Sequence, residues 1–491
     1  MQTNPYSPSQ WKHLIPDIDS VIQQIEKHNI IAVGITPFTR IIPGFFLKNF
    51  SIYAIKNSGD TDVLKKFMRM HVLEDRHPDL AKKVHGTGYL VSNYSFKAFL
   101  KSHKTPPTLK LNTISEKTAN ELEQMGIDWI GNHPRTFADV TYKSSFRELT
   151  RTLELSPLPT DTHSRDIFLT MNFKVLWANY EGPFVVQRGD KEVGGNEGTF
   201  FIHNAHDFES CLATLGKDTQ FSSVVVSPFI EGYSTSMLGC VMQGGTLTGP
   251  LQLQLIDVPQ ALNGVSPNGI FFGNDLGFHP WSEEIEHEAQ RIVEVLGLHM
   301  KENGYKGVFG IDFLYDIRRN KIYPNECNPR FTGSLVLYSL MLLQAKVPPM
   351  ELFHLMAHLD IASNFNFNTV NQALKTRIPC SHIAFSPRGI TSMQLALPAG
   401  VYAYDPKAAS LDFKRPGISL ADIQSEHEFL IIDTVPSLGT NIEQVVPRLF
   451  KFIFPRSIAR SSYEIDLEAG FLVERFSKAL LEAAEENRKV V

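Results

Sequence analysis

The stretch that most constrains the fold of this chain runs from Gly307 to Ser334 and reads GVFGIDFLYDIRRNKIYPNECNPRFTGS. It contains two short apolar runs joined by a charged turn at Ile317 to Lys321. Two such runs separated by a few turn residues are typical of a β-hairpin. Because side chains alternate between the two faces of a strand, the positions of the polar residues within these runs decide what the hairpin presents.

The polar residues of the second run fall on one face. Alternation along a strand makes Glu326, Asn328 and Arg330 point the same way. A register that closes a short loop over Arg318–Asn320 sets Asp312 directly across from Glu326. We therefore expect two carboxylates, an amide oxygen and a guanidinium to converge on one patch.

Oxygen donors on a rigid hairpin suit Mg²⁺ that is shared with phosphates, because Mg²⁺ takes few protein carboxylates and keeps places for substrate oxygens. Arg330 adds a planar fork that matches a phosphate or an acyl phosphate. The simple alternative is an exposed hairpin whose charges face water. It explains the alternation, but not why the acids sit between bulky apolar residues and are followed by Asn-Pro-Arg, so we favour the metal site.

Gly310-Ile311-Asp312-Phe313, followed by Glu326-Cys327-Asn328-Pro329-Arg330, resembles the metal-binding hairpin of the ATP-grasp superfamily. The match is fairly specific because both halves and their spacing agree. The resemblance implies ATP and Mg²⁺ (or Mn²⁺) as cofactors, with Asp312, Glu326 and Asn328 as the metal ligands.

The composition sets limits on partners and location. Net charge is −5 and no basic block stands out, so we expect no nucleic-acid partner. The four cysteines are scattered, with neither metal spacing nor a disulfide framework. No apolar run approaches the length that crosses a bilayer, and the start of the chain lacks an apolar signal core. We expect a cytoplasmic protein that does not enter a membrane.

With 491 residues, the chain is long enough for about three domains. Alternating strands and helices in residues 1–135 predict a small α/β domain with a mostly parallel sheet, similar to the domain that precedes many ATP-grasp cores. The ATP-grasp resemblance implies that residues 136–370 form the core. Residues 371–491 change character and predict a separate C-terminal α+β domain that caps the site or builds a homo-oligomer contact. The expected fold class is thus α/β, or α+β overall.

Four local expectations accompany this division. Thr61 to Met70 reads as a helix and Gly86 to Val91 as a strand. The Gly/Asn/Pro-rich passage between Asp257 and Trp281 reads as a loop over the active site. A helix is expected near Ile442 to Lys451.

Lys143 opens a helical run that ends before Ser156-Pro157. This arrangement resembles the first ATP-binding lysine of the ATP-grasp family. A lysine at a helix start is well placed to meet phosphate beside the exposed N–H groups. The alternative is a solvated surface lysine, which is the commoner fate of a single Lys.

A glycine-rich loop, Arg188 to Gly198, follows an apolar strand. Its glycines, among them Gly194, Gly195 and Gly198, would let backbone amides approach phosphate oxygens. By itself such a loop is equally a flexible hairpin tip.

The chain departs from the family pattern at the strand before this loop. The second ATP-binding lysine of the family usually ends this strand, and the matching place here is Gln187. Gln donates a hydrogen bond but supplies no charge. Either Arg188 or Lys191 supplies the positive charge that Gln187 lacks, or catalysis is weaker.

A further strand, Ser223 to Ile230, precedes Glu231-Gly232. By resemblance to ATP-grasp proteins this segment is the linker that contacts adenine, so Pro228, Phe229 and Ile230 would line the adenine pocket. Glu231 is the candidate for the ribose.

The resemblance implies an ATP-dependent carboxylate–amine ligase that forms an amide or peptide bond through an acyl phosphate. Its partners would be a small-molecule carboxylate and an amine, with an amino acid or short peptide the commonest choice in the family. Arg330 would steady the acyl phosphate. Two alternatives stay open, namely an ATP-binding regulatory protein with weakened catalysis and an ATP-grasp phosphotransferase with a different acceptor.

Overall fold

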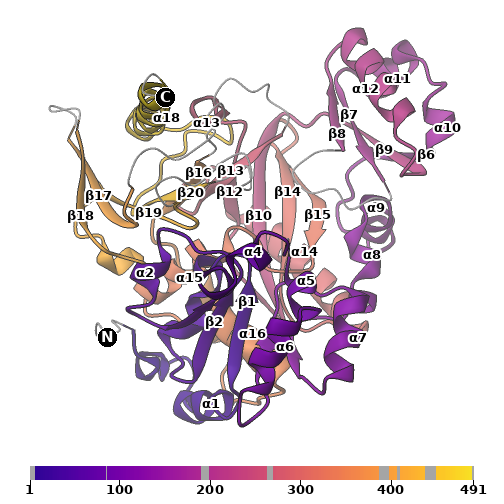
Figure 1. Ribbon diagram of the computed structural model, residues 1–491. Helices are drawn as coiled ribbons and strands as arrows, with labels where there is room; N and C mark the ends of the chain where they lie inside the picture. Colours follow the sequence, from indigo (N-terminus) through magenta and orange to yellow (C-terminus); the bar gives the residue numbers. More distant parts are fainter. Residues whose placement is uncertain are drawn as a thin grey trace.

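The computed structural model describes residues 6–84, 86–189, 198–262, 269–385, 397–405, 410–436 and 449–488. Its strands form three sheets: a parallel one near the N-terminus, a small antiparallel one, and a large antiparallel one (Figure 1). The predicted fold class, a mixed α/β chain with a parallel-sheet N-terminal part, is confirmed.

The first sheet has the strand order β3-β2-β1-β4-β5, and all its pairs are parallel. The fully buried strand β1 lies at its centre, as expected for a sheet covered on both faces. Its strands are β1 Ile30–Gly34, β2 Phe50–Ala54, β3 Arg69–Val72, β4 Thr108–Lys110 and β5 Trp129–Ile130. Its α-helices are α1 Ile18–Ile25, α2 Thr61–Leu64, α3 Leu73–Arg76, α4 Pro78–Ala81, α5 Thr87–Val91, α6 Tyr94–Lys101 and α7 Glu116–Gln124.

Two local predictions in this region are wrong. The helix expected over Thr61 to Met70 ends at Leu64, and the chain then enters β3, which pairs with β2. Gly86 to Val91 forms helix α5 rather than a strand. Leu90 and Val91 are both buried, although they are neighbours, and a short apolar run of this kind fits a helix as well as a strand.

The second sheet has the order β6-β9-β7-β8 and forms a lobe with three helices (Figure 1, upper right). Two helices, α8 Ala138–Thr141 and α9 Lys143–Thr152, precede it. Its strands are β6 Asp161–Ser164, β7 Phe184–Arg188, β8 Thr199–Ile202 and β9 Ser223–Pro228, and its helices are α10 Arg165–Phe168, α11 Phe173–Asn179 and α12 Ala205–Lys217. An aromatic core of Phe168, Phe173, Phe184 and Phe208 fixes the helices to the sheet.

The large sheet has the order β15-β14-β10-β12-β13-β16-β20-β19-β17-β18, with β11 paired to β10. Its first strands are β10 Gly232–Met242, β11 Gly245–Thr248, β12 Gln252–Ile256, β13 Phe271–Asp275, β14 Gly307–Asp316 and β15 Lys321–Asn328. The accompanying helices are α13 Pro259–Leu262, α14 Glu283–Glu302, α15 Leu335–Gln344, α16 Met350–His358 and α17 Phe367–Leu374. The passage expected to be a loop before Trp281 therefore contains α13 and β13, because residues 271–275 pair with β12.

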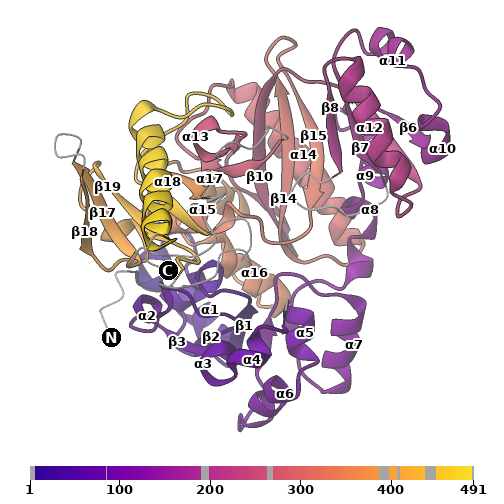
Figure 2. The ribbon, with the colours of Figure 1, turned by 45° about the horizontal axis from the view of Figure 1, so that its top comes forward.

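The strands after residue 370 extend the same sheet. They are β16 Ser381–Phe385, β17 Gly400–Asp405, β18 Ser410–Arg415, β19 Glu428–Ile432 and β20 Phe450–Phe454, and β16 pairs directly with β13. Of the helix expected near Ile442 to Lys451, residues 442–448 lie outside the described residues and Phe450–Phe454 is a strand. The last helix, α18 Leu467–Arg488, lies against this end of the sheet through the contact of Phe476 with Phe452 (Figure 2). The domain limits at residues 135 and 370 stay predictions, but the sheet is continuous across the second one.

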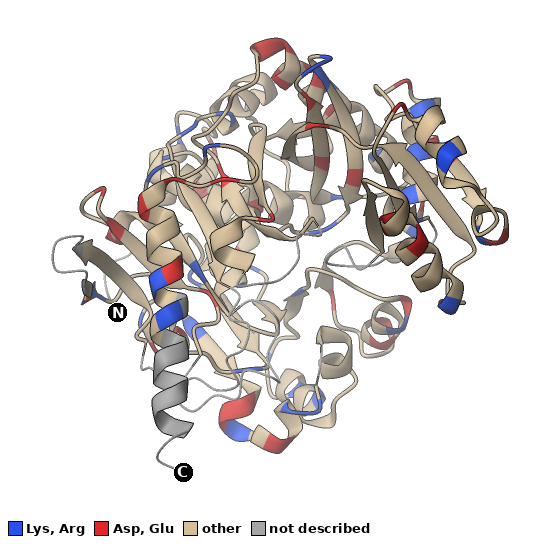
Figure 3. Cartoon of the chain, turned by 90° about the horizontal axis from the view of Figure 1, so that it is seen from above, with Lys and Arg blue, Asp and Glu red and all other residues tan. Residues whose placement is uncertain are grey.

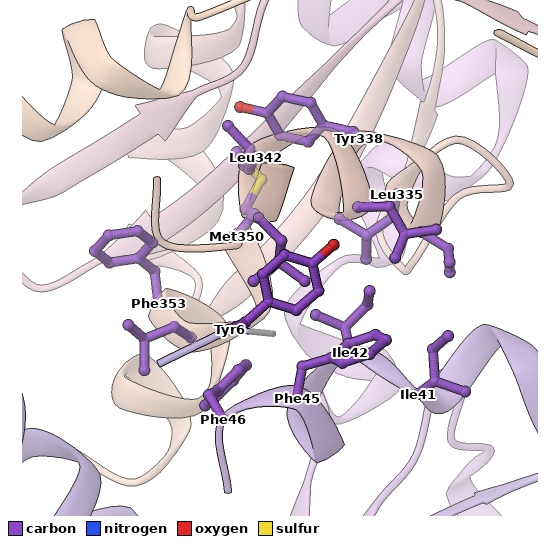
Figure 4. Close-up of a cluster of buried hydrophobic side chains, with 14 of the residues drawn as sticks. Tyr6, Ile41, Ile42, Phe45, Phe46, Leu335, Tyr338, Leu342, Met350 and Phe353 are labelled. Carbon is purple, nitrogen blue, oxygen red and sulfur yellow. The ribbon is translucent and has the colours of Figure 1, made fainter. Parts of the chain in front are cut away.

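The N-terminal part is fixed to the helices that follow the hairpin. Tyr6, Ile42 and Phe45 pack in one buried cluster with residues of α15 and α16, including Leu335 and Met350 (Figure 4). Helix α15 is buried on all sides, as expected for a helix that is apolar around its whole circumference. The parallel sheet and the hairpin are therefore held in one relative position by a shared core.

Charged residues of both signs are interspersed over the described chain, including α18 (Figure 3). Among the described residues, no helix is both long enough and apolar enough to cross a membrane.

Asp275, at the end of β13, joins the two halves of the large sheet. Its side chain is fully buried and accepts hydrogen bonds from the N–H groups of Gly277 (2.8 Å) and Phe278 (2.9 Å). Its second oxygen accepts from the Ser457 hydroxyl and from the N–H groups of Ile458 and Ala459, at 2.8–2.9 Å. One carboxylate thus holds the segment after β20 against β13.

We expect Asp275→Ala to lower the free energy of unfolding by about 3 kcal/mol or more, because buried donors lose their acceptor. Denaturant titration measures it, with Asp79→Ala, an exposed acid, as the control. A loss no larger than that of the control would contradict this role.

Candidate functional site

The hairpin of β14 and β15 places the two acids opposite each other, as the sequence predicts, but its turn is longer than the expected Arg318–Asn320: Asp316 pairs with Lys321, so residues 317–320 form the loop. Asp312 lies opposite Glu326, and Gly310 lies opposite Asn328. The alternate residues Ile311 and Phe313 are buried in the core on the other face. The apolar residues therefore anchor the strands, and the two acids are left side by side on the open face.

This pairing depends on a β-bulge in β15. Phe313 pairs with Pro324 while Asp312 pairs with Glu326, so Asn325 is the extra, unpaired residue. Ile322 and Cys327 both lie in the core although they are five positions apart, an odd spacing that an unbroken strand would place on opposite faces. Without the bulge, Glu326 would face away from Asp312.

Helix α9 contacts the bulge with two cations. The fully buried guanidinium of Arg147 donates to the carbonyl oxygen of Pro324 (2.7 Å) and to the side-chain oxygen of Asn325 (2.5 Å). One helical turn earlier, the Lys143 ammonium donates to Glu326 at 2.6 Å. Burial lowers the pKa of Arg147 to about 10, which leaves it charged at neutral pH.

Asp312 is held by two amides. The side-chain amide of Asn328 donates to one carboxylate oxygen (3.0 Å), and that of Gln254 on β12 donates to the other (2.9 Å). Burial and the neighbouring Glu326 raise the pKa of Asp312 to about 7. Negative charge on this pair is therefore disfavoured, and a cation beside the two carboxylates would relieve it.

A cavity of about 780 Å³, which we call cavity 1, opens beside this pair. Asp312 and Glu326 line one side of it, and the small antiparallel sheet lines the other. Six of the predicted site residues line the cavity: Gln187, Pro228, Phe229, Ile230, Asp312 and Glu326. Away from the acids, the ring centroid of Phe229 lies 5.2 Å from that of His203 and 6.1 Å from that of Phe201.

Other predicted site residues lie elsewhere. Arg188 forms an ion pair with Asp218 (2.8 Å) and is not among the residues that line cavity 1. Glu231 is exposed and pairs with Arg318 in the hairpin turn. Gln187 donates to the Thr199 hydroxyl at 3.2 Å.

Of the glycine-rich loop, Gly194, Gly195 and Lys191 lie outside the described residues. Gly198 is described, and its carbonyl accepts a hydrogen bond from the Arg188 N–H (3.0 Å). The roles predicted for these residues stay predictions.

Arg330 lines a second cavity of about 630 Å³, which we call cavity 2. Its guanidinium donates to the carbonyl oxygen of Phe331 at 3.3 Å. Asn328, two residues earlier, contacts Asp312 beside cavity 1. The end of the hairpin thus lies between the two cavities.

Comparison with known families decides the assignment of this region. Residues 185–334 match the family model described as an ATP-grasp domain. The chain contains an ATP-grasp domain. The matched segment begins in β7 and ends directly before α15, so it includes the walls of cavity 1 and the whole hairpin.

Solved structures with the ATP-grasp fold resemble the chain well beyond this segment. A biotin carboxylase–β,γ-ATP complex from Campylobacter jejuni has a TM-score of 0.57 at 11% identity, covering 87% of this chain and 87% of that chain. An L-amino acid ligase from Bacillus licheniformis has a TM-score of 0.51 at 11% identity, covering 92% of this chain and 97% of that chain. A Rhizobium etli pyruvate carboxylase has a TM-score of 0.54 at 14% identity, covering 91% of this chain and 37% of that chain. At these identities the likeness concerns the fold. No curated protein matches the sequence.

Two residues that support the acid pair were missed by the sequence reasoning, Arg147 and Gln254. Arg147 stands one helical turn after Lys143, a spacing that puts both side chains on one face of α9. That spacing was the available signal for Arg147. Gln254 follows only from the strand order, because β12 and β14 flank β10.

We expect Arg147→Met to weaken divalent-metal affinity about 10- to 100-fold, because the bulge that presents Glu326 loses its two hydrogen bonds. Electron paramagnetic resonance of bound Mn²⁺ measures this in the presence of a non-hydrolysable ATP analogue. Arg151→Met, one turn further along α9, is the matched control; its exposed guanidinium contacts exposed Glu148 and the carbonyl oxygen of Thr160. Unchanged Mn²⁺ affinity in a folded Arg147→Met variant would show that the bulge does not depend on Arg147.

Proposed function

We propose that this protein is an ATP-dependent carboxylate–amine ligase that binds MgATP in cavity 1 and forms an amide or peptide bond. The observation that carries the proposal is the pair of Asp312 and Glu326 on the wall of cavity 1, inside the matched ATP-grasp segment. The neighbours with the same fold include an L-amino acid ligase and a biotin carboxylase crystallised as a β,γ-ATP complex, which supports ATP use.

The donor set fits Mg²⁺. Asp312, Glu326 and Asn328 offer only oxygen ligands, once the Asn328 amide turns its oxygen to the metal. Within the described part of the chain, no group of three or more His, Cys, Asp or Glu side chains could hold a metal ion. Two acids and an amide leave coordination places for phosphate oxygens, which is how Mg²⁺ is usually bound with a nucleotide.

The nucleotide would lie along cavity 1 with its adenine beside Pro228, Phe229 and Ile230 and its phosphates toward the acids. Lys143 now neutralises Glu326 at 2.6 Å. With Glu326 engaged by a bound cation, the Lys143 ammonium at the start of α9 would be available to a phosphate. The same lysine would thus stabilise the acid pair before binding and the phosphate after it.

The reaction forms a bond between a carboxylate oxygen of the substrate and the γ-phosphorus, and breaks the bond from that phosphorus to ADP. The amine nitrogen then attacks the acyl carbon, phosphate leaves, and the amine loses a proton. Bound Mg²⁺ supplies charge neutralisation during phosphoryl transfer. Arg330, which lines cavity 2 and whose charge opposes the rise in the pKa of Asp312, would neutralise the acyl phosphate.

One observation favours the regulatory alternative. Gln187 carries no charge, and Arg188, the next residue in the chain, is tied to Asp218. An ATP-binding regulatory protein would bind nucleotide without releasing ADP when carboxylates and amines are supplied. An ATP-grasp phosphotransferase would release ADP without any dependence on the amine.

We expect Glu326→Gln to lower ADP release about a hundredfold or more while the fold stays intact, because one of the two metal-bridging charges is lost. The assay is coupled ADP detection with a panel of carboxylates and amines, and circular dichroism checks the fold. Glu148→Gln, an exposed acid on α9, is the control. Full turnover in a folded Glu326→Gln variant would remove Glu326 from the metal site.

We expect Arg330→Lys to lower kcat more than nucleotide affinity, because the lysine keeps the charge but loses the bidentate fork. Calorimetry with a non-hydrolysable ATP analogue gives the affinity, and the ADP assay gives kcat and KM. Equal losses in affinity and rate would assign Arg330 to ATP binding instead.

A further inference from the structure

Cavity 2 lies on the far side of the hairpin end from cavity 1. Three parts of the chain supply most of its lining: residues 111–116 between β4 and α7, residues from 131 to 142 around α8, and the hairpin end at 329–331. Tyr305, Val308 and His354 complete it. The first two of these parts follow the carboxyl ends of β4 and β5 in the parallel sheet. In open parallel sheets, ligands bind at this edge.

One end of cavity 2 carries the guanidinium of Arg330. Arg330 donates only to a backbone carbonyl and, among the described residues, forms no ion pair. His354 lines the same cavity, and its Nδ1 accepts from the Val308 N–H at 3.1 Å. Burial lowers the pKa of His354, so the ring is neutral and Nε2 carries the hydrogen. That Nε2 is itself buried, without a hydrogen-bond partner in the described chain, so Arg330 is the donor that the cavity offers to a ligand at this end.

Contacts of the next residue, Phe331, fix the position of Arg330. The ring of Phe331 lies under the buried Lys110 ammonium, 4.0 Å from the ring centroid. The same ring packs edge-on against His354, with 4.7 Å between ring centroids. These contacts tie the hairpin end to β4, which carries Lys110, and to α16, which carries His354.

The remaining walls of cavity 2 are largely apolar. Buried Leu111 and Ile114 come from the segment before α7, and Phe137 and Tyr142 come from the two ends of α8. The one acid among the lining residues, Glu116, faces His133 at 3.3 Å. A single negatively charged group with an apolar body matches one guanidinium, Arg330, beside largely apolar walls.

We infer that cavity 2 binds the carboxylate substrate, with its carboxylate at Arg330 and an apolar acyl group against Leu111, Ile114 and Phe137. The inference rests on the proposed ligase function and adds the class of acid: a monocarboxylic acid or amino acid with an apolar side chain. A second carboxylate on the acyl group would be placed against apolar walls and lose its hydration without a partner. Exposed Arg135 also lines cavity 2 and could pair with a second carboxylate, so the test includes dicarboxylates.

Hydroxylamine makes the test independent of the natural amine. The acid takes the γ-phosphoryl group and releases ADP, and hydroxylamine nitrogen then displaces phosphate to give a hydroxamate and a proton. The panel contains acetate, glycine, leucine, phenylalanine, succinate and glutamate, each with MgATP, and hydroxamate is measured by its ferric complex. We expect hydroxamate chiefly from leucine and phenylalanine.

A variant locates the effect in cavity 2. Ala138, exposed on α8 and lining the cavity, becomes phenylalanine in Ala138→Phe, which fills the space of the acyl group. We expect the KM for leucine and phenylalanine to rise about tenfold or more, while the affinity for the ATP analogue stays unchanged. Ala213→Phe, an exposed alanine on α12, is the matched control.

The outcomes separate this inference from the ligase proposal. Hydroxamate formed chiefly from succinate or glutamate, or an Ala138→Phe variant with wild-type KM for leucine and phenylalanine, would overturn the apolar pocket and leave the ligase standing. If no acid yields ADP and hydroxamate, the ligase proposal itself fails.

Discussion

The pairing of Asp312 with Glu326 depends on one extra residue in β15. Cross-strand neighbours on one face of a hairpin lie within a few ångströms, so two acids placed there repel each other unless cations or donors surround them. The structure supplies these groups from three directions: Lys143 on α9, Asn328 on β15, and Gln254 on β12. The acid pair is thus maintained by elements that are distant in sequence and adjacent in space.

The rest of the fold places the two cavities around that pair. The small antiparallel sheet closes cavity 1, and the carboxyl edge of the parallel sheet closes cavity 2. The buried cluster that joins the N-terminal residues to α15 and α16 holds the parallel sheet, and with it the wall of cavity 2, in place. A ligase needs its nucleotide and its acid on opposite sides of one phosphorus atom. The hairpin end has cavity 1 on one side and cavity 2 on the other.

The sequence was informative where the interaction is local. That β14 and β15 form a hairpin follows from alternation and from the turn residues, and the start of α9 at Lys143 follows from helical periodicity. The bulge was not predictable, since Arg147 stabilises it from 177 positions away in the chain. Strand β13 was also missed, because its short run between glycine-rich segments becomes a strand only by pairing with β12 and β16. Pairing of Arg188 with Asp218 is a contact of the same non-local kind.

The central claim is that the Asp312–Glu326 face is a metal–nucleotide site, and a crystal structure with Mg²⁺ and a non-hydrolysable ATP analogue tests it most directly. The account predicts a metal ion in contact with oxygens of both acids, adenine beside Phe229, and the Lys143 ammonium moved from Glu326 to a phosphate. A nucleotide bound elsewhere, or a Lys143–Glu326 pair that stays intact with no metal between the acids, would contradict it.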